Sequence, residues 1–255
     1  MKTVKVRNLV IGEGRPKICV PLIGADMEEI REETRRVLAL PADMIEWRAD
    51  YFRDVTDRGA LTSCLRELRE IVGEMPLLFT LRSEVEGGAF GGSGGQYAEI
   101  VAAAAASGCV DLVDIELARI EAAAGPDLVG AAHRCGVRVV ASHHDFDATP
   151  AKAELTERFC SMLSHDADIL KIAVMPHDFK DVLTLMEATE EVSRLHGDRP
   201  VIGISMGRLG LITRAAAETF GSSVCYAAGP SGSSAPGQIS ARDVDEMLRI
   251  IHEFQ

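Results

Sequence analysis

The run Ile169-Leu170-Lys171-Ile172-Ala173-Val174-Met175 places a lysine in a stretch that is otherwise apolar enough to form a buried strand. None of the chain's five other lysines lies in such surroundings. Short apolar runs of this kind recur along the sequence, with amphipathic helical stretches between them. This alternation predicts repeated β-α units and a parallel sheet.

Eight strands are expected, each followed by a helix. The strands are expected over residues 18–22, 44–49, 77–82, 112–117, 137–143, 169–175, 201–206 and 224–228. The helices are expected over residues 27–40, 57–72, 96–106, 120–135, 151–164, 179–195, 209–220 and 241–254. Several of the helices have a capping-type residue near their start, such as Asp57 or Ser240.

Eight units of similar length predict an α/β fold in which the strands close into a (β/α)8 TIM barrel. A doubly wound open sheet is the alternative, but no glycine-rich dinucleotide fingerprint follows the first strand. Residues 4–11, closed by Gly12-Glu13-Gly14, are expected to belong to a β-hairpin that covers the bottom of the barrel. Residues 1–255 are expected to form one catalytic domain.

Composition restricts the possible partners of the chain. A net charge of -12 without a long basic run argues against a nucleic-acid or anionic membrane surface, so a small-molecule partner is favoured. No signal-peptide core or apolar stretch of about 20 residues is present, and we expect a soluble cytoplasmic protein. The six cysteines form no CxxC pair and the histidines lack metal-ligand spacing, so neither disulfides nor a metal or cofactor is expected.

Lys171 suggests covalent chemistry. A primary amine kept out of water is disfavoured as ammonium, and the neutral amine can form a Schiff base with a ketone. The alternative is an edge-strand lysine whose stem packs while its amine reaches solvent.

Polar residues near the carboxyl ends of other strands belong to the same region of a barrel. Glu46, Arg48 and Asp50 share one face of the second strand, either as site residues or as a structural ion-pair ladder. Arg82 and Glu86 follow the third strand. Asp114 and Glu116 lie on one face of the fourth, where an acid either orients Arg48 or Lys171 or forms an inner salt bridge that serves packing.

The fifth strand offers two imidazoles, His143 and His144, which point to opposite faces if the strand continues through both. Only one of them can enter the site and transfer protons. Met206 ends the seventh strand, where simple barrel packing is the favoured interpretation and pocket lining is the alternative. Arg214 and the loop of residues 231–238 complete the rim, and this loop is either a lid or a solvated linker.

The glycine-rich stretch of residues 87–95 lacks the Gly-Lys-Ser/Thr ending of a phosphate-binding loop. We interpret it as a flexible connection between the third strand and the helix that follows.

Taken together and in order, the strand ends resemble those of the type I 3-dehydroquinate dehydratase family. The segments that carry the resemblance are Ile45-Glu46-Trp47-Arg48, Phe79-Thr80-Leu81-Arg82 with Glu86-Gly87-Gly88, Ser142 with His144-Asp145-Phe146, Lys171-Ile172-Ala173, Ser205-Met206 and Ser234-Ala235-Pro236-Gly237-Gln238-Ile239. The resemblance covers essentially the whole chain. It implies a Schiff-base hydro-lyase of the shikimate pathway that converts 3-dehydroquinate to 3-dehydroshikimate, and it favours a homodimer.

The resemblance also implies a role for each matching residue. It makes Lys171 the Schiff-base lysine, His144 the general acid/base and Glu86 the acid that orients His144. The residues implied to contact the substrate are Glu46, Arg48 and Arg82 at the ring hydroxyls, Arg214 at the carboxylate, Ser234 and Gln238 in the lid, and Met206 and Tyr226 along the wall.

Two other functions compete with this one. A class I aldolase also uses a lysine on the sixth barrel strand, but it predicts a phosphate site, for which no suitable glycine-rich turn follows strands seven and eight. A non-catalytic barrel that binds a ligand or a protein has no need of Lys171, His144 and Glu86 together.

Overall fold

The computed structural model describes residues 3–122, 125 and 127–254. Eight parallel strands form a sheet in the order β10-β3-β4-β5-β6-β7-β8-β9. The strands are β3 (Lys17–Leu22), β4 (Met44–Arg48), β5 (Leu77–Thr80), β6 (Leu112–Glu116), β7 (Arg138–Asp145), β8 (Ile169–Val174), β9 (Val201–Ser205) and β10 (Val224–Tyr226). The Ser223 amide donates to the Val201 carbonyl at 2.8 Å and joins the two ends of the sheet. The predicted TIM barrel is therefore confirmed, and the open doubly wound sheet is wrong.

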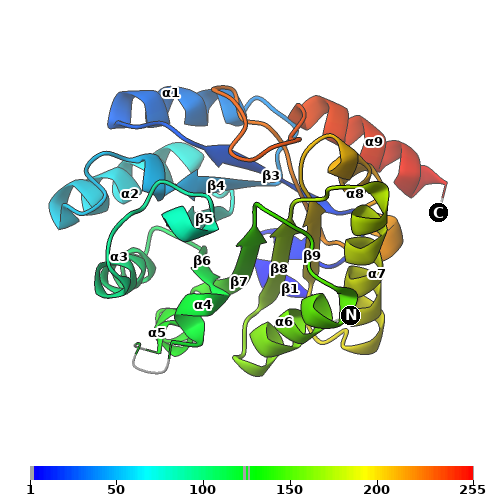
Figure 1. Ribbon diagram of the computed structural model, residues 1–255. Coiled ribbons are helices and arrows are strands. Elements are labelled where there is room, and N and C mark those ends of the chain that lie inside the picture. Colours follow the sequence, from blue (N-terminus) through cyan, green and yellow to red (C-terminus); the bar gives the residue numbers. More distant parts are fainter. Residues whose placement is uncertain (1–2, 123–124, 126, 255) are drawn as a thin grey trace.

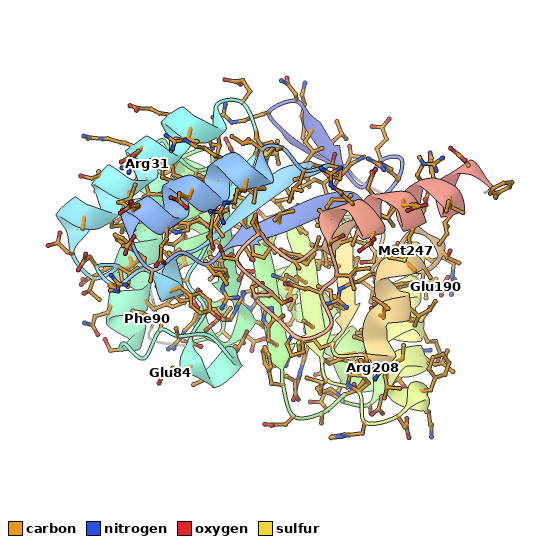
Figure 2. The ribbon with its side chains drawn as sticks, turned by 90° about the horizontal axis from the view of Figure 1, so that it is seen from above. Arg31, Glu84, Phe90, Glu190, Arg208 and Met247 are labelled. Carbon is orange, nitrogen blue, oxygen red and sulfur yellow. The ribbon has the colours of Figure 1, made fainter. Side chains whose placement is uncertain are left out.

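Helices cover the outside of this sheet (Figure 1). The longer ones are α1 (Met27–Val37), α2 (Arg58–Val72), α3 (Gly94–Ala106), α6 (Lys152–Ser164), α7 (Phe179–Leu195) and α9 (Ala241–Glu253), and shorter ones are α4 (Leu117–Ile120), α5 (Leu128–Arg134) and α8 (Ile212–Ala215). Turns of 3-10 helix are η1 (Ala49–Tyr51), η2 (Glu84–Glu86), η3 (Leu209–Leu211) and η4 (Glu218–Phe220). Figure 2 shows Arg31 of α1 and Glu190 of α7 in this outer layer.

Helix α1 illustrates how sequence sets these elements. The Asp26 carboxylate accepts hydrogen bonds from the backbone amides of Glu28 and Glu29, both at 3.1 Å, and so caps the first turn. Ile30 and Val37, seven residues apart, are fully buried against the sheet. The cap fixes where α1 begins, and the apolar stripe fixes which face packs inward.

The bottom of the barrel is closed by an apolar layer. Each of the eight strands contributes one buried side chain to it, namely Cys19, Met44, Leu78, Leu112, Val140, Ile169, Ile202 and Val224. The antiparallel hairpin of β1 (Val4–Val6) and β2 (Leu9–Ile11) adds Val4, Val6 and Ile11 to the same cluster. The hairpin thus covers the bottom of the barrel, as predicted, and leaves the carboxyl ends of the strands for polar residues.

Two predicted helices are broken in the structure. In place of a helix over residues 120–135, α4 ends at Ile120 and α5 begins after Asp127, whose carboxylate accepts from the Gly130 amide at 2.8 Å. Residues 123, 124 and 126 of that prediction lie outside the described residues.

The second broken helix was predicted over residues 209–220. It is divided into η3, α8 and η4. The Thr213 hydroxyl donates to the Gly210 carbonyl at 2.7 Å, a local bond that competes with helical pairing, and Gly221 ends the last turn at φ 83°.

Within the described part of the chain, no helix is both long and apolar enough to cross a membrane.

Candidate active site

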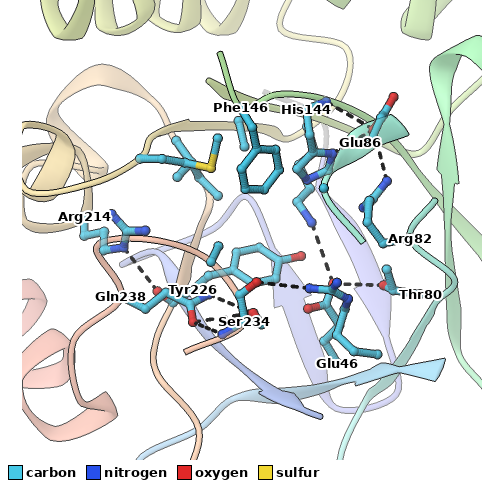
Figure 3. Close-up of a pocket in the computed structure, with 17 residues that line it drawn as sticks. Glu46, Thr80, Arg82, Glu86, His144, Phe146, Arg214, Tyr226, Ser234 and Gln238 are labelled. Atoms are coloured by element: carbon cyan, nitrogen blue, oxygen red, sulfur yellow. Dashed lines mark hydrogen bonds and ion pairs between the residues drawn. The ribbon is translucent and has the colours of Figure 1, made fainter. Parts of the chain in front are cut away.

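One pocket at the carboxyl ends of the strands brings the predicted site residues together (Figure 3). All eleven residues named by the resemblance line it, namely Glu46, Arg48, Arg82, Glu86, His144, Lys171, Met206, Arg214, Tyr226, Ser234 and Gln238. Side chains that were given no role in the sequence also line it, including Thr80, Phe146 and Ile204. Phe146 follows His144 by two positions, a spacing that would have placed both on one face of a continuing strand.

Lys171 lies in the interior of the barrel. Strand β8 pairs with β7 on one side and β9 on the other, and the lysine is only 4% exposed. Its Nζ atom lies 3.3 Å from Asp114 Oδ2, 3.7 Å from Glu46 Oε1 and 4.2 Å from the centre of the Tyr226 ring. The edge-strand alternative is therefore wrong, and the nearest charged partners of the amine are two carboxylates.

His144 and Glu86 form a buried pair. His144 Nδ1 lies 2.9 Å from Glu86 Oε2, and the same oxygen accepts from the His144 backbone amide and from Arg82 Nη1, both at 3.2 Å. Because two donors already point at Oε2, that oxygen acts as an acceptor and His144 Nδ1 must be its donor. The unprotonated Nε2 is then the atom left to face the pocket and accept a proton.

The electrostatics of this pair suit proton transfer. Burial, reinforced by the charge of Arg82, holds the pKa of His144 well below the usual imidazole range, so the ring is neutral near pH 7. Burial also raises the pKa of Glu86 to about 8, against the attraction of Arg82. The imidazole is thus available as a base, and the Glu86 charge changes in the neutral to alkaline range.

His143 lies on the opposite face of the same strand. Strand β7 continues to Asp145, so successive side chains alternate and only His144 lines the pocket. His143 Nε2 contacts the Arg158 guanidinium of α6, and its Nδ1 lies 3.8 Å from the second Glu86 oxygen. Burial and Arg158 lower the pKa of His143 to about 4.

Two pocket arginines are held by carboxylates. Arg48 forms a bidentate pair with Asp50, with both hydrogen bonds at 2.8 Å. Arg82 Nη1 points at Glu86, Glu116 and Ser142, and its Nη2 donates to Asp114 at 2.7 Å. The ion-pair ladder predicted as one alternative for β4 is thus present between Arg48 and Asp50. Glu46 does not belong to it, because it accepts from Thr80 at 2.9 Å and faces Lys171.

Arg214 differs from those two arginines. Among residues 3–122, 125 and 127–254, no carboxylate lies within ion-pair distance of it, and its nitrogens make only bonds of 3.4 Å to backbone carbonyls. The side chain is buried, and this desolvation lowers the pKa of its guanidinium. A buried cation without a counterion favours an anionic ligand in the pocket.

The loop of residues 231–238 covers the pocket. The Ser234 amide donates to Gln238 Oε1 at 2.9 Å, and the Gln238 amide group donates back to Ser234 Oγ at 3.1 Å. Arg48 Nη1 donates to the Ser234 carbonyl at 3.3 Å, and Arg214 Nη2 to the Pro236 carbonyl at 3.4 Å. Ser234, Ala235 and Gln238 of this loop line the pocket, an arrangement that favours a lid over a solvated linker.

The glycine-rich stretch after Arg82 is more tightly bonded than the flexible connection predicted for it. The Gly88 amide donates to the Ser83 carbonyl at 2.8 Å, and the Phe90 amide to the Arg82 carbonyl at 3.1 Å. A Cβ atom on Gly87 would lie 2.3 Å from the Phe146 ring, at a φ of 76°. Close packing and positive φ explain Gly87 better than flexibility does.

The part of the chain that the structure describes contains no cluster of three or more His, Cys, Asp or Glu side chains arranged to hold a metal ion.

Known proteins share both sequence and fold with this chain. The family model described as type I 3-dehydroquinase matches residues 18–255. A 3-dehydroquinate dehydratase from Clostridioides difficile is 42% identical over 99% of this chain and 98% of its own length. One from Salmonella typhimurium is 44% identical over 99% of this chain and 100% of its own length.

Solved structures of 3-dehydroquinate dehydratases are also similar to this chain in fold. A crystal structure of type I 3-dehydroquinate dehydratase from Clostridium difficile, described as carrying covalently modified comenic acid, superposes with a TM-score of 0.94. It is 41% identical and covers 100% of this chain and 99% of its own. The enzyme from Geobacillus kaustophilus gives a TM-score of 0.93 at 42% identity, over 100% of this chain and 98% of its own. The chain belongs to the type I 3-dehydroquinase family.

Proposed function

We propose that this protein is a 3-dehydroquinate dehydratase of the shikimate pathway, which forms a Schiff base between Lys171 and its substrate. The observation that carries the proposal is the placement of a buried lysine and the His144–Glu86 pair around one pocket, which is also lined by Arg214, a cation with no carboxylate partner among the described residues. A nucleophile, a proton-transfer group and an anion-binding group are what a carboxylated ketone requires.

The reaction begins with Lys171. Its ammonium gives one proton to solvent, and the nitrogen lone pair attacks the C3 ketone while the carbonyl electrons move to oxygen. A proton moves from nitrogen to that oxygen to give the carbinolamine. The carbinolamine hydroxyl takes one proton back from solvent and leaves as water, which gives an iminium that serves as the electron sink. His144 Nε2 takes the C2 proton, and that C–H electron pair forms an enamine.

The enamine expels the C1 hydroxyl group, to which His144 returns the proton, so one water leaves from the same side of the ring. A second water hydrolyses the product iminium and balances the water lost when it formed. The net change is 3-dehydroquinate to 3-dehydroshikimate and water. Lys171 and His144 are regenerated.

Substrate orientation is assigned to the surrounding residues. Arg214 is the carboxylate clamp, because it is the buried guanidinium without a described carboxylate partner. Glu46 and Arg48 are assigned to the ring hydroxyls, and Ser234 and Gln238 to contacts from the lid. Met206 and Tyr226 form part of the wall. Arg82, whose donors are engaged by four neighbours, acts mainly by fixing the carboxylates around it.

Family membership favours the dehydratase over a class I aldolase. The non-catalytic barrel is also disfavoured, because enzymes more than 40% identical over nearly the whole length are named 3-dehydroquinate dehydratase. We further propose that the chain acts as a single catalytic domain in the cytoplasm and assembles as a homodimer. Sedimentation of the purified protein tests the oligomeric part of this proposal.

The test of function is peptide mass spectrometry after borohydride treatment in the presence of 3-dehydroquinate. Reduction converts an iminium to a stable amine, so we expect a ligand-dependent adduct on the peptide that contains Lys171. The folded protein should also turn over 3-dehydroquinate but none of a panel of sugar phosphates. An adduct with a sugar phosphate and none with 3-dehydroquinate would favour the aldolase instead.

The His144–Glu86 pair makes a prediction about pH. Glu86 is a neutral acid below about pH 8 and a carboxylate above it, and the carboxylate makes His144 a stronger base through Nδ1. We expect kcat/KM to rise as the pH increases through about 8. In Glu86→Gln the part of this rise that is centred near pH 8 should disappear, while Glu84→Gln, at an exposed position of the same 3-10 turn, should keep it. An unchanged pH profile in Glu86→Gln would contradict this assignment.

A further inference from the structure

Two buried carboxylates on β6 have no role in the reaction described above. Asp114 and Glu116 are each 1% exposed, lie two residues apart, and both contact Arg82. They differ in one respect. Asp114 Oδ2 lies 3.3 Å from Lys171 Nζ, whereas Glu116 binds the amide and hydroxyl of Ser83 at 2.8 and 2.9 Å.

The surroundings of Asp114 fix its orientation. Its Oδ1 atom accepts from Ser142 Oγ at 2.6 Å and from Arg82 Nη2 at 2.7 Å. These two bonds occupy one oxygen and leave Oδ2 directed at Lys171. Burial opposes ionisation of this group, but the charges of Arg82 and Lys171 and the hydrogen bonds from Ser142 and Arg82 together outweigh it, and the pKa of Asp114 lies below its usual range. A buried, fixed carboxylate is therefore present beside the amine throughout the neutral pH range.

We propose that Asp114 is the counterion of the Lys171 nitrogen, first as ammonium and then as the substrate iminium, and so sets the pH at which the lysine captures its ketone. The inference rests on the Schiff-base function proposed above. Ammonium and iminium both carry a positive charge, whereas the attacking amine is neutral. A carboxylate at this distance stabilises the two charged forms relative to the neutral one.

Two opposite effects on the reaction follow. Asp114 makes the ammonium harder to deprotonate, so capture of the ketone requires a higher pH. Once the iminium has formed, the same carboxylate stabilises it. We therefore expect Asp114 to slow the capture of the ketone at acid pH. At high pH, where the rate of capture no longer changes with pH, we expect Asp114 to increase the amount of covalent intermediate.

Other charged or titratable groups face the same nitrogen from neighbouring strands. They are Glu46 from β4, Cys19 from β3, Arg82 from the loop after β5 through Asp114, His144 from β7 and Tyr226 from β10. Glu46 is the second carboxylate, at 3.7 Å, and it also accepts from Thr80. Removing the Asp114 charge therefore leaves the lysine with one weaker counterion, so we expect a shifted pH dependence with capture retained.

The experiment compares Asp114→Asn with Glu116→Gln in the full chain. The rate and final yield of the borohydride-trapped Lys171 adduct with 3-dehydroquinate are measured as a function of pH. The midpoint is the pH at which the trapping rate reaches half of its maximum. We expect Asp114→Asn to lower this midpoint by about one to three pH units, which is the usual effect of an opposite charge at such a distance, and to reduce the final yield of adduct at high pH. Glu116→Gln, which removes a carboxylate from the same strand and from Arg82, should leave the midpoint near that of the unmodified protein.

Each outcome has a distinct meaning. If the unmodified protein forms no adduct, the Schiff-base function itself fails. If it forms the adduct and Asp114→Asn has the same midpoint, the counterion role is overturned. Equal shifts in both variants would also overturn it, because the effect would then come from the charges around Arg82 and not from the contact with Lys171.

A second variant covers the case in which Asp114→Asn does not fold. Ser142→Ala keeps the Asp114 charge but removes one of the two bonds that fix Oδ1. We expect it to lower the midpoint in the same direction by a smaller amount. A midpoint equal to that of the unmodified protein would contradict the proposal in this variant too.

Discussion

Replacing Lys171 with alanine should abolish covalent capture of 3-dehydroquinate and, with it, turnover. The buried amine of Lys171 on β8 is the nucleophile that we propose, and among the described residues no other lysine lines the pocket. Because the entire iminium route is lost, the fall in kcat/KM should approach the full acceleration of an enzyme, on the order of 10⁶-fold or more. Intact-protein mass spectrometry after borohydride treatment and a turnover assay measure the two effects.

The control for this variant is Lys180→Ala, which removes an exposed lysine at the start of α7. It should retain both the adduct and turnover. A Lys171→Ala protein that still acquires a ligand-dependent adduct would show that the nucleophile lies elsewhere. Thermal unfolding of both variants checks that the barrel remains folded.

Replacing His144 with alanine should separate capture from elimination. Lys171 keeps its carboxylate neighbours and can still form the iminium, but no imidazole remains to remove the C2 proton. Turnover should fall by about 10² to 10⁴-fold, the usual contribution of a general acid/base. The borohydride adduct should persist and should carry the mass of the substrate iminium, because the reaction stops before loss of the C1 hydroxyl group.

His143→Ala is the matched control, since it removes the neighbouring imidazole from the outer face of the same strand. Its loss of turnover should be much smaller. Near-normal turnover in His144→Ala would instead exclude His144 as the acid/base.

Several parts of the fold were predictable from local sequence. Eight apolar runs alternating with amphipathic stretches predicted the barrel, because each strand of a parallel sheet is covered by helices and reads as an apolar segment. The helices over residues 120–135 and 209–220 were predicted wrongly. Their breaks depend on Asp127 capping a new helix and on Thr213 bonding to Gly210, and helical periodicity does not reveal either contact.

The sequence predicted which residues belong to the site, but it did not predict which of them contact one another. Strand alternation and the carboxyl-end rule place Lys171, His144 and Glu46 at one mouth, since the ends of all strands meet there. Strand alternation alone did not choose between His143 and His144. The choice depends on which face of β7 turns toward the barrel axis, a property of the closed sheet.

By itself, then, the sequence determined the alternation of strands and helices, the apolar floor of the barrel and the set of reactive groups at its mouth. These follow from side-chain chemistry and from the two-residue period of a strand. Only the tertiary structure decided that Arg82 is engaged by carboxylates while Arg214 has no described carboxylate partner, and that Asp114 faces Lys171. Such pairings join residues tens of positions apart, and they exist only after closure of the barrel brings their strands within a few ångströms.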